Sequence, residues 1–147
     1  MKLSQSVTYA IHAVLRLAES REGTPVSCGR LAERGAMPER FLLQILRDLA
    51  KQGILQSTRG GGGGFTLGRR ASEISLLDLI EAVEGPVGAT LPLRTGFPPG
   101  VRDRLQEALN QIVATTRGQL DSIKIASLLE PGGDANPRRP APSGVNR

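Results

Sequence analysis

The 147-residue sequence predicts a mainly α-helical fold that carries one small β-hairpin. Within residues 1–85, four segments place apolar residues at the three- and four-residue spacing of a helix. Between the third and fourth of these segments, two short strand-like stretches flank a run of five glycines. A longer segment, residues 101–123, repeats the helical spacing over about six turns.

The first helix is expected from about Ser4 to Ser20, before Gly23-Thr24-Pro25 interrupts the chain. Its apolar positions should face a core: Val7, Ile11, Val14, Leu15 and Ala18. Its polar positions should face solvent: Gln5, Thr8, His12, Arg16 and Glu19. His12, the only histidine, is therefore expected to be an exposed helix residue rather than a ligand.

The second helix is short and is expected over about Cys28–Arg34. Ser27 suits its N-cap, because a serine hydroxyl can accept a hydrogen bond from a free N–H of the first turn. Residues 35–37 are the right length for a tight turn to a third helix, expected from Pro38 to about Gln52. Gly53 is placed to end that helix. Its core stripe is expected to be Leu42, Ile45, Leu46 and Leu49.

A hairpin is expected next, with strands over Ile54–Ser57 and Phe65–Gly68. The five glycines between them lose much backbone entropy on ordering, which a hairpin tip that closely approaches another molecule would explain. A phosphate-binding P-loop is rejected because it needs Gly-Lys-Ser/Thr at the start of a helix. Here the glycines lead into a strand pattern instead.

A fourth helix should begin after Ser75, with Asp78 as its capping partner, and end at Gly85-Pro86. A long helix is expected from Val101 to about Ile123, followed by a brief helix near residues 125–129. The apolar positions of the long helix lie at a spacing close to a heptad seam. They are Val101, Leu105, Leu109, Ile112, Thr116, Leu120 and Ile123.

Three helices followed by a hairpin define a winged helix-turn-helix, whose helix after the tight turn enters the major groove of DNA. We expect residues 1–85 to form this DNA-binding domain, residues 86–100 a loop, residues 101–130 a dimerisation helix and residues 131–147 a disordered tail. The expected dimer contacts are Leu105, Leu109, Ile112, Thr116 and Leu120. The alternative for this seam is ordinary core within one chain.

The third helix supplies the expected contacts to base edges: Glu39, Arg40, Phe41 and Gln44. Arginine can bond guanine, glutamine adenine, and glutamate the cytosine amino group. Phe41 either contacts a thymine methyl group or packs against the first helix. Arg47 and Lys51 are expected on phosphates, with a plain solvated helix face as the alternative.

The hairpin is expected to add contacts from Ser57, Thr58, Arg59 and Gly60. Arg59 stands at the root of the glycine tip, from which it can enter a narrow, A·T-rich minor groove. The net charge of the chain is +5, and the segment from Ser27 to Arg70, with eight basic and three acidic residues, carries all of it. This concentration indicates an electrostatic footprint for nucleic acid.

Little catalytic or metal chemistry is available to the chain, which has one cysteine and one histidine. We find no catalytic triad and no cluster of metal ligands, so we expect neither an enzyme nor a metal site. Cys28 is either a small inert residue, which we favour, or a thiol sensor whose pKa is lowered at a helix N-terminus. Without disulfides, a signal peptide or a membrane span, the protein is expected in the cytoplasm.

Several short motifs together carry a family resemblance. They are Tyr9-Ala10, Leu31-Ala32-Glu33, Phe41-Leu42, Gln44-Ile45-Leu46, Gly53-Ile54-Leu55, Ser57, Arg59-Gly60, Gly63-Gly64-Phe65, Leu67, Ile74-Ser75-Leu76 and residues 80–85. Over residues 1 to about 130 the sequence resembles the Rrf2 family of winged helix-turn-helix transcription regulators. The resemblance implies a homodimer joined by the long helix that binds an imperfect palindrome in promoters.

The sequence departs from the cluster-binding members of this family, which carry three cysteines in the loop before the long helix. Residues 86–100 contain none, so we expect no iron–sulfur cluster. We therefore expect a homodimeric regulator of transcription, acting as a repressor on double-stranded DNA. Its effector, a small molecule or a protein, is not indicated. The alternative is a winged-helix module that binds a protein and reads no bases.

Overall fold

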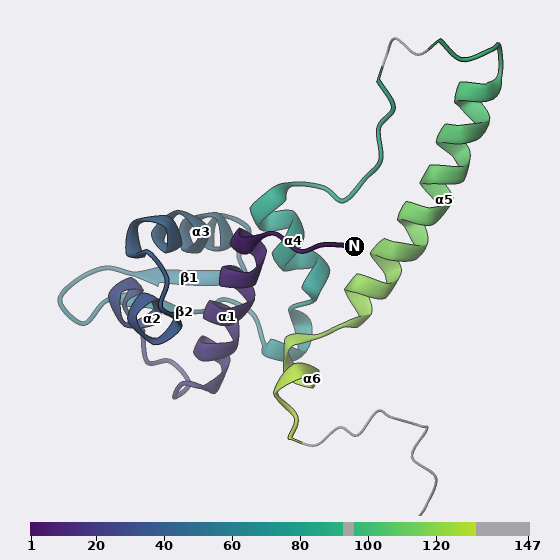
Figure 1. Ribbon diagram of the computed structural model, residues 1–147. Coiled ribbons are helices and arrows are strands. Elements are labelled where there is room, and N and C mark those ends of the chain that lie inside the picture. Colours follow the sequence, from purple (N-terminus) through teal and green to yellow (C-terminus); the bar gives the residue numbers. More distant parts are fainter. Residues whose placement is uncertain (93–95, 132–147) are drawn as a thin grey trace, which may run out of the picture.

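The computed structural model describes residues 1–92 and 96–131. The elements are α1 (Gln5–Glu19), α2 (Cys28–Gly35), α3 (Glu39–Lys51), β1 (Leu55–Thr58), β2 (Gly64–Leu67), the 3₁₀ helix η1 (Ala71–Glu73), α4 (Leu76–Glu84), α5 (Val101–Ser122) and α6 (Ile125–Leu129). The hairpin extends from one side of the helical body and α5 from the other (Figure 1). The predicted mainly helical fold is confirmed, while the predicted tail lies outside the described residues beyond position 131.

Helix α1 lies at the centre of this body, in contact with α2, α3, α4, α6 and β2. The Ser4 side chain caps it by accepting a hydrogen bond from the Val7 amide. Ala10 and Ala13 are fully buried. Their small side chains allow the surrounding elements to pack closely against α1. The predicted core positions Ile11, Leu15 and Ala18 are only partly buried, since they flank this stripe. None of the described helices is long and apolar enough to span a bilayer.

The turn between α2 and α3 packs against α1. Its left-handed residue is Ala36, with φ 50° and ψ 43°. Gly35, the last residue of α2, is not left-handed but is tightly packed. A Cβ atom there would meet the Met37 side chain and the His12 ring. His12 is therefore partly buried, and its Nδ1 atom has no hydrogen-bond partner. The prediction of an exposed His12 is wrong, because the ring covers this turn.

Helix α3 begins one residue later than predicted, because Pro38 keeps extended backbone angles (φ −62°, ψ 120°) and serves as the N-cap. Gly53 follows the helix with a φ of 76°, the left-handed conformation that commonly ends helices. The predicted core stripe is buried: Leu42, Ile45, Leu46 and Leu49. Burial of these four side chains fixes which face of α3 points outward.

The hairpin is antiparallel, with Leu55 opposite Leu67 and Thr58 opposite Gly64. Both strands lie one residue nearer the tip than predicted. Val26, in the segment before α2, forms a bridge to Phe65 through two backbone hydrogen bonds of 2.9 and 3.0 Å. A Cβ atom on Gly64 would overlap the Val26 carbonyl group, so the glycine allows this close approach.

The start of α4 is capped as predicted. The Ser75 hydroxyl accepts a hydrogen bond from the Asp78 amide, and the Asp78 carboxylate accepts one from the Ser75 amide, each at 3.0 Å. Two backbone hydrogen bonds of 2.8 and 2.9 Å then join residues 74–76 to residues 123–125. These bonds connect the first turn of α4 to the chain that leaves α5.

Side chains strengthen the same junction. Val7 of α1, Leu77 and Ile80 of α4 and Leu120 of α5 form an apolar cluster. Leu120 is only 6% exposed, so it belongs to the core of its own chain. Its prediction as a contact to a partner helix is corrected: near its C-terminal end, α5 turns the seam toward α1 and α4.

Replacing Gly64 with alanine should lower the free energy of unfolding by about 1–3 kcal/mol, because the new Cβ forces the Val26 backbone away. Gly61→Ala is the matched control, since nothing lies within 4 Å of a Cβ there. We expect that control to change stability by less than about 0.5 kcal/mol. Urea unfolding followed by circular dichroism measures both, and equal stabilities would contradict the role assigned to the bridge.

Candidate nucleic-acid interface

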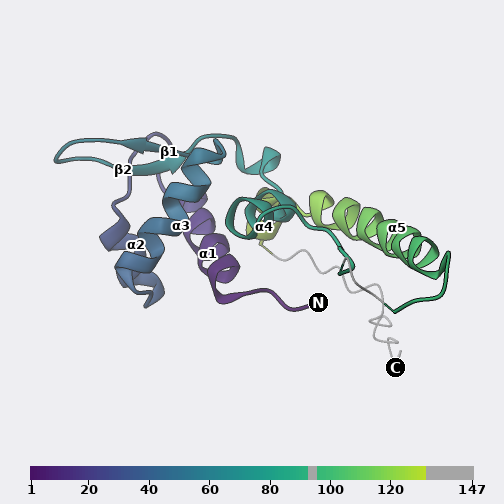
Figure 2. The same cartoon turned by 90° about the horizontal axis from the view of Figure 1, so that it is seen from above.

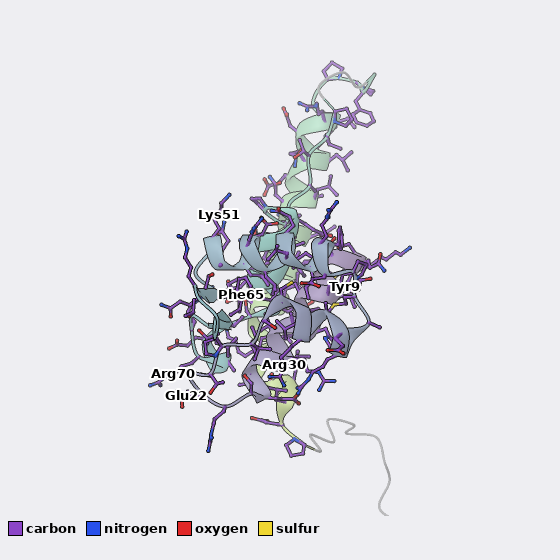
Figure 3. The ribbon with its side chains drawn as sticks, turned by 90° about the vertical axis from the view of Figure 1, so that its left-hand side faces the viewer. Tyr9, Glu22, Arg30, Lys51, Phe65 and Arg70 are labelled. Carbon is purple, nitrogen blue, oxygen red and sulfur yellow. The ribbon has the colours of Figure 1, made fainter. Side chains whose placement is uncertain are left out.

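The outward face of α3 presents polar and basic side chains. Arg40, Gln44, Arg47 and Lys51 are all exposed, as predicted. Their spacing of three and four residues places them on the side of the helix opposite its buried leucines. Lys51, at the C-terminal end of α3, points away from the helical body (Figure 3). This face is available to a ligand without any change in the core.

Phe41 packs against α1, one of its two predicted arrangements, and still exposes part of its ring. Its ring meets the ring of Tyr9 on α1 edge to face, with centroids 5.9 Å apart and an interplanar angle of 80°. The residue nevertheless remains 46% exposed. The contact with Tyr9 therefore positions the Phe41 ring at the start of α3 and leaves part of it accessible.

Two of the predicted base-reading side chains have neighbours that the sequence argument missed. Gln44 Nε2 donates a hydrogen bond of 3.1 Å to Asp48 Oδ1, one turn along α3. This bond orients the amide, whose oxygen and second N–H have no partner assigned among the described residues. The Glu39 carboxylate lies beside Gly29 of α2, with Oε1 3.5 Å from the position of a Cβ there. Glu39 itself is exposed.

Cys28 lies where α2 meets the start of α3, and its Sγ donates a 3.5 Å hydrogen bond to the Glu39 carbonyl oxygen. Burial raises the pKa of the Cys28 thiol above its ordinary value, and the Glu39 carboxylate raises it further. The positive charge of Arg47 opposes this with a smaller effect. This raised pKa speaks against the alternative of a thiol sensor, which needed a lowered pKa, and supports the inert interpretation that the sequence favours.

The tip of the hairpin stands clear of the helical body (Figure 2). The predicted contact residues are exposed: Ser57, Thr58, Arg59 and Gly60. A hydrogen bond of 2.9 Å from the Gly63 amide to the Gly60 carbonyl oxygen closes the turn. Gly60 has a φ of 111°, a conformation that side chains rarely adopt. The glycines therefore make a narrow tip, with Arg59 at its root.

The basic side chains around this surface are available for phosphates. On α2, α3 and the hairpin tip they are Arg30, Arg34, Arg40, Arg47, Lys51 and Arg59, all exposed. Within residues 1–92 and 96–131, ion pairs form elsewhere, and none of these six side chains takes part in one. Arg30 and Arg34 were not among the contacts predicted from the sequence. Both are exposed on α2, the helix that packs against α3.

Helix α5 keeps most of its predicted seam uncovered. Leu105 is 36% and Ile112 61% exposed, and Leu109 and Thr116 are partly exposed. A shallow hollow of about 450 Å³ runs beside Ile112 and is lined by Ala108, Gln111, Ile112, Thr115 and Thr116. Exposed apolar side chains at helical spacing are typical of a surface that another helix covers.

The loop that follows α4 is held along α5 by hydrogen bonds from α5 side chains. Arg117 Nη1 contacts Glu81 Oε2 at 2.8 Å and the Val87 carbonyl oxygen at 3.2 Å. The Val87 amide donates to the same Glu81 oxygen at 3.0 Å. Gln106 reaches the carbonyl oxygen of Ala89, and Arg102 those of residues 91 and 92. Residues 87–92 are thus held beside α5 by hydrogen bonds.

The arrangement of helices, turn and hairpin, with an exposed basic helix after the turn, defines a winged helix-turn-helix DNA-binding protein. Residues 3–131 match the Rrf2 family, which is described as an iron-dependent transcriptional regulator. The chain therefore belongs to the Rrf2 family of transcriptional regulators, and it is a DNA-binding regulator rather than an enzyme.

Individual relatives agree with this assignment. The HTH-type transcriptional regulator IscR of Escherichia coli O1:K1 is 38% identical over 130 residues, which cover 88% of this chain and 80% of that protein. The structure of CymR, the global cysteine regulator of B. subtilis, has a TM-score of 0.70 at 26% identity, covering 87% of this chain and 95% of that one. T. potens IscR has a TM-score of 0.67 at 29% identity, covering 88% and 86%.

The donor set does not fit the iron–sulfur cluster of cluster-binding family members. Such clusters are held by several thiolates, with histidine as an occasional substitute. The chain has one of each, Cys28 and His12, and neither lies in the loop between α4 and α5. In the part of the chain that the structure describes, no three His, Cys, Asp or Glu side chains are grouped to hold a metal ion.

Glu81→Gln should destabilise the protein at neutral pH, because the Arg117 hydrogen bond holds the pKa of Glu81 below its ordinary value. A lowered pKa means that the ionised carboxylate stabilises the fold above the unfolded pKa of about 4.3. That contribution disappears as the pH falls through the lowered pKa. The urea midpoints of variant and wild type should therefore differ at pH 7 and converge in acid.

Glu84→Gln is the control for this prediction, because Glu84 is exposed and forms no ion pair among the described residues. It should shift the urea midpoint less than Glu81→Gln at neutral pH. A difference for Glu81→Gln that stays constant down to strongly acid pH would contradict an electrostatic origin.

Proposed function

We propose that the protein is a cytoplasmic, homodimeric repressor. It binds palindromic promoter sites in double-stranded DNA and works without an iron–sulfur cluster. The observation that carries the proposal is that the described part of the chain exposes two surfaces that no element of its own covers. One is the basic face of α3 with the hairpin tip, and the other is the apolar seam of α5.

The proposed dimer follows from the length of α5 and from its exposure. A helix of 22 residues is about 33 Å long, and its C-terminal end enters the apolar cluster with α1 and α4. The preceding turns of α5 have residues 87–92 on one side. On another side they expose the apolar seam of Leu105, Leu109, Ile112 and Thr116. A second copy related by a twofold axis would cover the same seam in both chains.

The proposed contacts with DNA divide between α3 and the hairpin. Arg40, Phe41 and Gln44 face the groove from the first turns of α3, and Arg47 and Lys51 reach phosphates further along. Arg59 enters the minor groove from the hairpin tip. In a dimer, two such units bind half-sites about one helical turn apart, 34–36 Å in related folds. Occupation of a promoter by this dimer would block transcription.

The proposal of a cluster-free regulator rests on the donor set and on the anchored loop. Arg117, Gln106 and Arg102 hold residues 87–92 along α5. Residues 87–92 therefore have defined hydrogen-bond partners that are not thiolates. The signal is accordingly expected to be something other than loss or oxidation of a bound cluster.

Arg59→Ala should weaken binding to a specific duplex about tenfold or more, because an arginine in direct groove contact contributes roughly 1–3 kcal/mol. Arg138→Ala removes the same charge near the C-terminus and should leave the affinity nearly unchanged. Fluorescence anisotropy with a labelled duplex measures both affinities. Equal losses would refute the assignment of the hairpin tip to DNA and would favour a winged-helix module that binds a protein.

Ile112→Glu should convert the dimer into monomers, because the interface would then bury an unpaired carboxylate. Ile112 is 61% exposed in the single chain, so the fold itself should tolerate the change. Ala114→Glu adds the same charge to the opposite, exposed side of α5 and should leave the dimer intact. Sedimentation equilibrium distinguishes the species, and a monomeric wild type would overturn the proposed assembly.

Protein purified without oxygen should be colourless, because the chain lacks the thiolates that an iron–sulfur cluster requires. Ultraviolet–visible absorption together with an iron assay checks this. A reproducible band near roughly 400 nm with stoichiometric iron in the present protein would contradict the proposal.

A further inference from the structure

A cavity of about 550 Å³ lies beneath the hairpin, away from the face of α3. Its walls come from the last turn of α1, residues 20–24, Gln56 and Thr66 of the hairpin, and residues 67–71. In Figure 3, Glu22 and Arg70 lie near one another in this region, and the hairpin separates them from Lys51 of α3. The cavity therefore belongs to a different surface from the candidate DNA contacts.

Three arginines line this cavity against one carboxylate. The cations are Arg21, Arg69 and Arg70, and the acid is Glu22. Among the described residues, Arg21, Arg70 and Glu22 form no ion pair. The lining therefore carries an excess of positive charge whose natural partner is an anion.

Arg69 adds an unsatisfied donor. Its Nη1 lies 3.6 Å from Asp78 Oδ2, a distance longer than a good charge-assisted hydrogen bond. Its Nε is buried and has no hydrogen-bond partner. Buried donors without a partner are rare because their desolvation is not compensated. A ligand in the cavity would meet the accessible part of the Arg69 side chain, which is 37% exposed, rather than the buried Nε.

Another part of the wall is apolar and comes from Leu17, Ala18, Leu67 and Ala71. The volume falls in the range of small-molecule sites, which combine an apolar lining with a few polar anchors. Guanidinium groups recognise carboxylate and phosphate oxygens through paired N–H donors. A ligand that matches both walls carries an oxyanion on a small apolar body.

We propose that this cavity is a binding site for a small organic anion, with its carboxylate or phosphate on Arg21, Arg69 and Arg70 and its apolar part against Leu17 and Leu67. Gln56 and Thr66, which face each other across the hairpin, provide further polar contacts.

The position of the cavity connects such a ligand to the regulator function, and this step rests on the proposed function. Gln56 precedes the predicted contacts Ser57 and Thr58 on β1. Arg69 contacts Asp78, which caps α4 through Ser75. A ligand that draws Arg69 toward its oxyanion thus acts on both the hairpin and the start of α4, and it should change the affinity for DNA.

The test uses benzoate and phenyl phosphate as probes, with benzamide as the uncharged control, titrated into the ¹⁵N-labelled full chain. We expect saturable amide shifts in residues 17–24, 56 and 66–71, with a Kd near 1 mM, roughly what a ten-atom fragment achieves. The double variant R21Q/R70Q should bind tenfold or more weakly, and R104Q, an exposed change on α5, should bind as wild type. Preference for one probe identifies the oxyanion.

Shifts that do not saturate, equal binding of benzamide, or unchanged binding by R21Q/R70Q would overturn the site. The R21Q/R70Q variant should keep its DNA affinity when no probe is present. A tenfold loss there would assign these arginines to the DNA backbone and overturn the proposal. Because probe binding is measured without DNA, a failure of the cavity is distinguishable from a failure of the DNA-binding function.

Discussion

The junction between α4, α5 and α1 determines how the two exposed surfaces of this protein are placed relative to each other. Val7, Leu77, Ile80 and Leu120 are buried together there, and each fully buried aliphatic side chain contributes roughly 1.5–3 kcal/mol. Backbone hydrogen bonds join residues 74–76 to residues 123–125 across the same junction. As a result α5 leaves the body in one direction, and α3, which packs against α1, has a fixed orientation to it (Figure 1). A dimer built on α5 would therefore present its two α3 helices at one spacing.

Helix α4 contacts the lining of the cavity, helix α5 and the loop that follows α4. Asp78 caps its first turn and also contacts Arg69, which lines the cavity beneath the hairpin. One turn later, Glu81 binds Arg117 of α5 and the amide of Val87 in the loop. A change at the cavity, at the loop or at a partner of α5 would therefore reach the same short helix. In the proposed cluster-free regulator, α4 would be the element through which a signal passes without metal ligands.

The sequence predicted the helices well because each boundary has a local cause. Ser27, Ser75 and Gly53 cap or end helices through their own backbone neighbours. Predictions failed where distant contacts decide. Leu120 is buried against Val7, which lies more than a hundred residues away in the sequence. His12 is covered by the turn between α2 and α3, which the spacing of residues within α1 does not reveal. The cavity beneath the hairpin was not predicted for the same reason, because its arginines come from two segments that are far apart in the sequence. The exposure of α3 and of the hairpin tip was predictable, whereas the bond from Gln44 to Asp48 depends on side-chain conformation.

The most direct test is selection of duplexes from a random pool by metal-free protein, followed by affinity measurements over a salt series. The account predicts that the selected sequences contain two inverted half-sites about one helical turn apart. They should bind at least about a thousandfold more tightly than scrambled duplexes at physiological salt. No enrichment, or equal and weak binding to selected and scrambled duplexes, would contradict the claim that a rigid, cluster-free dimer reads DNA.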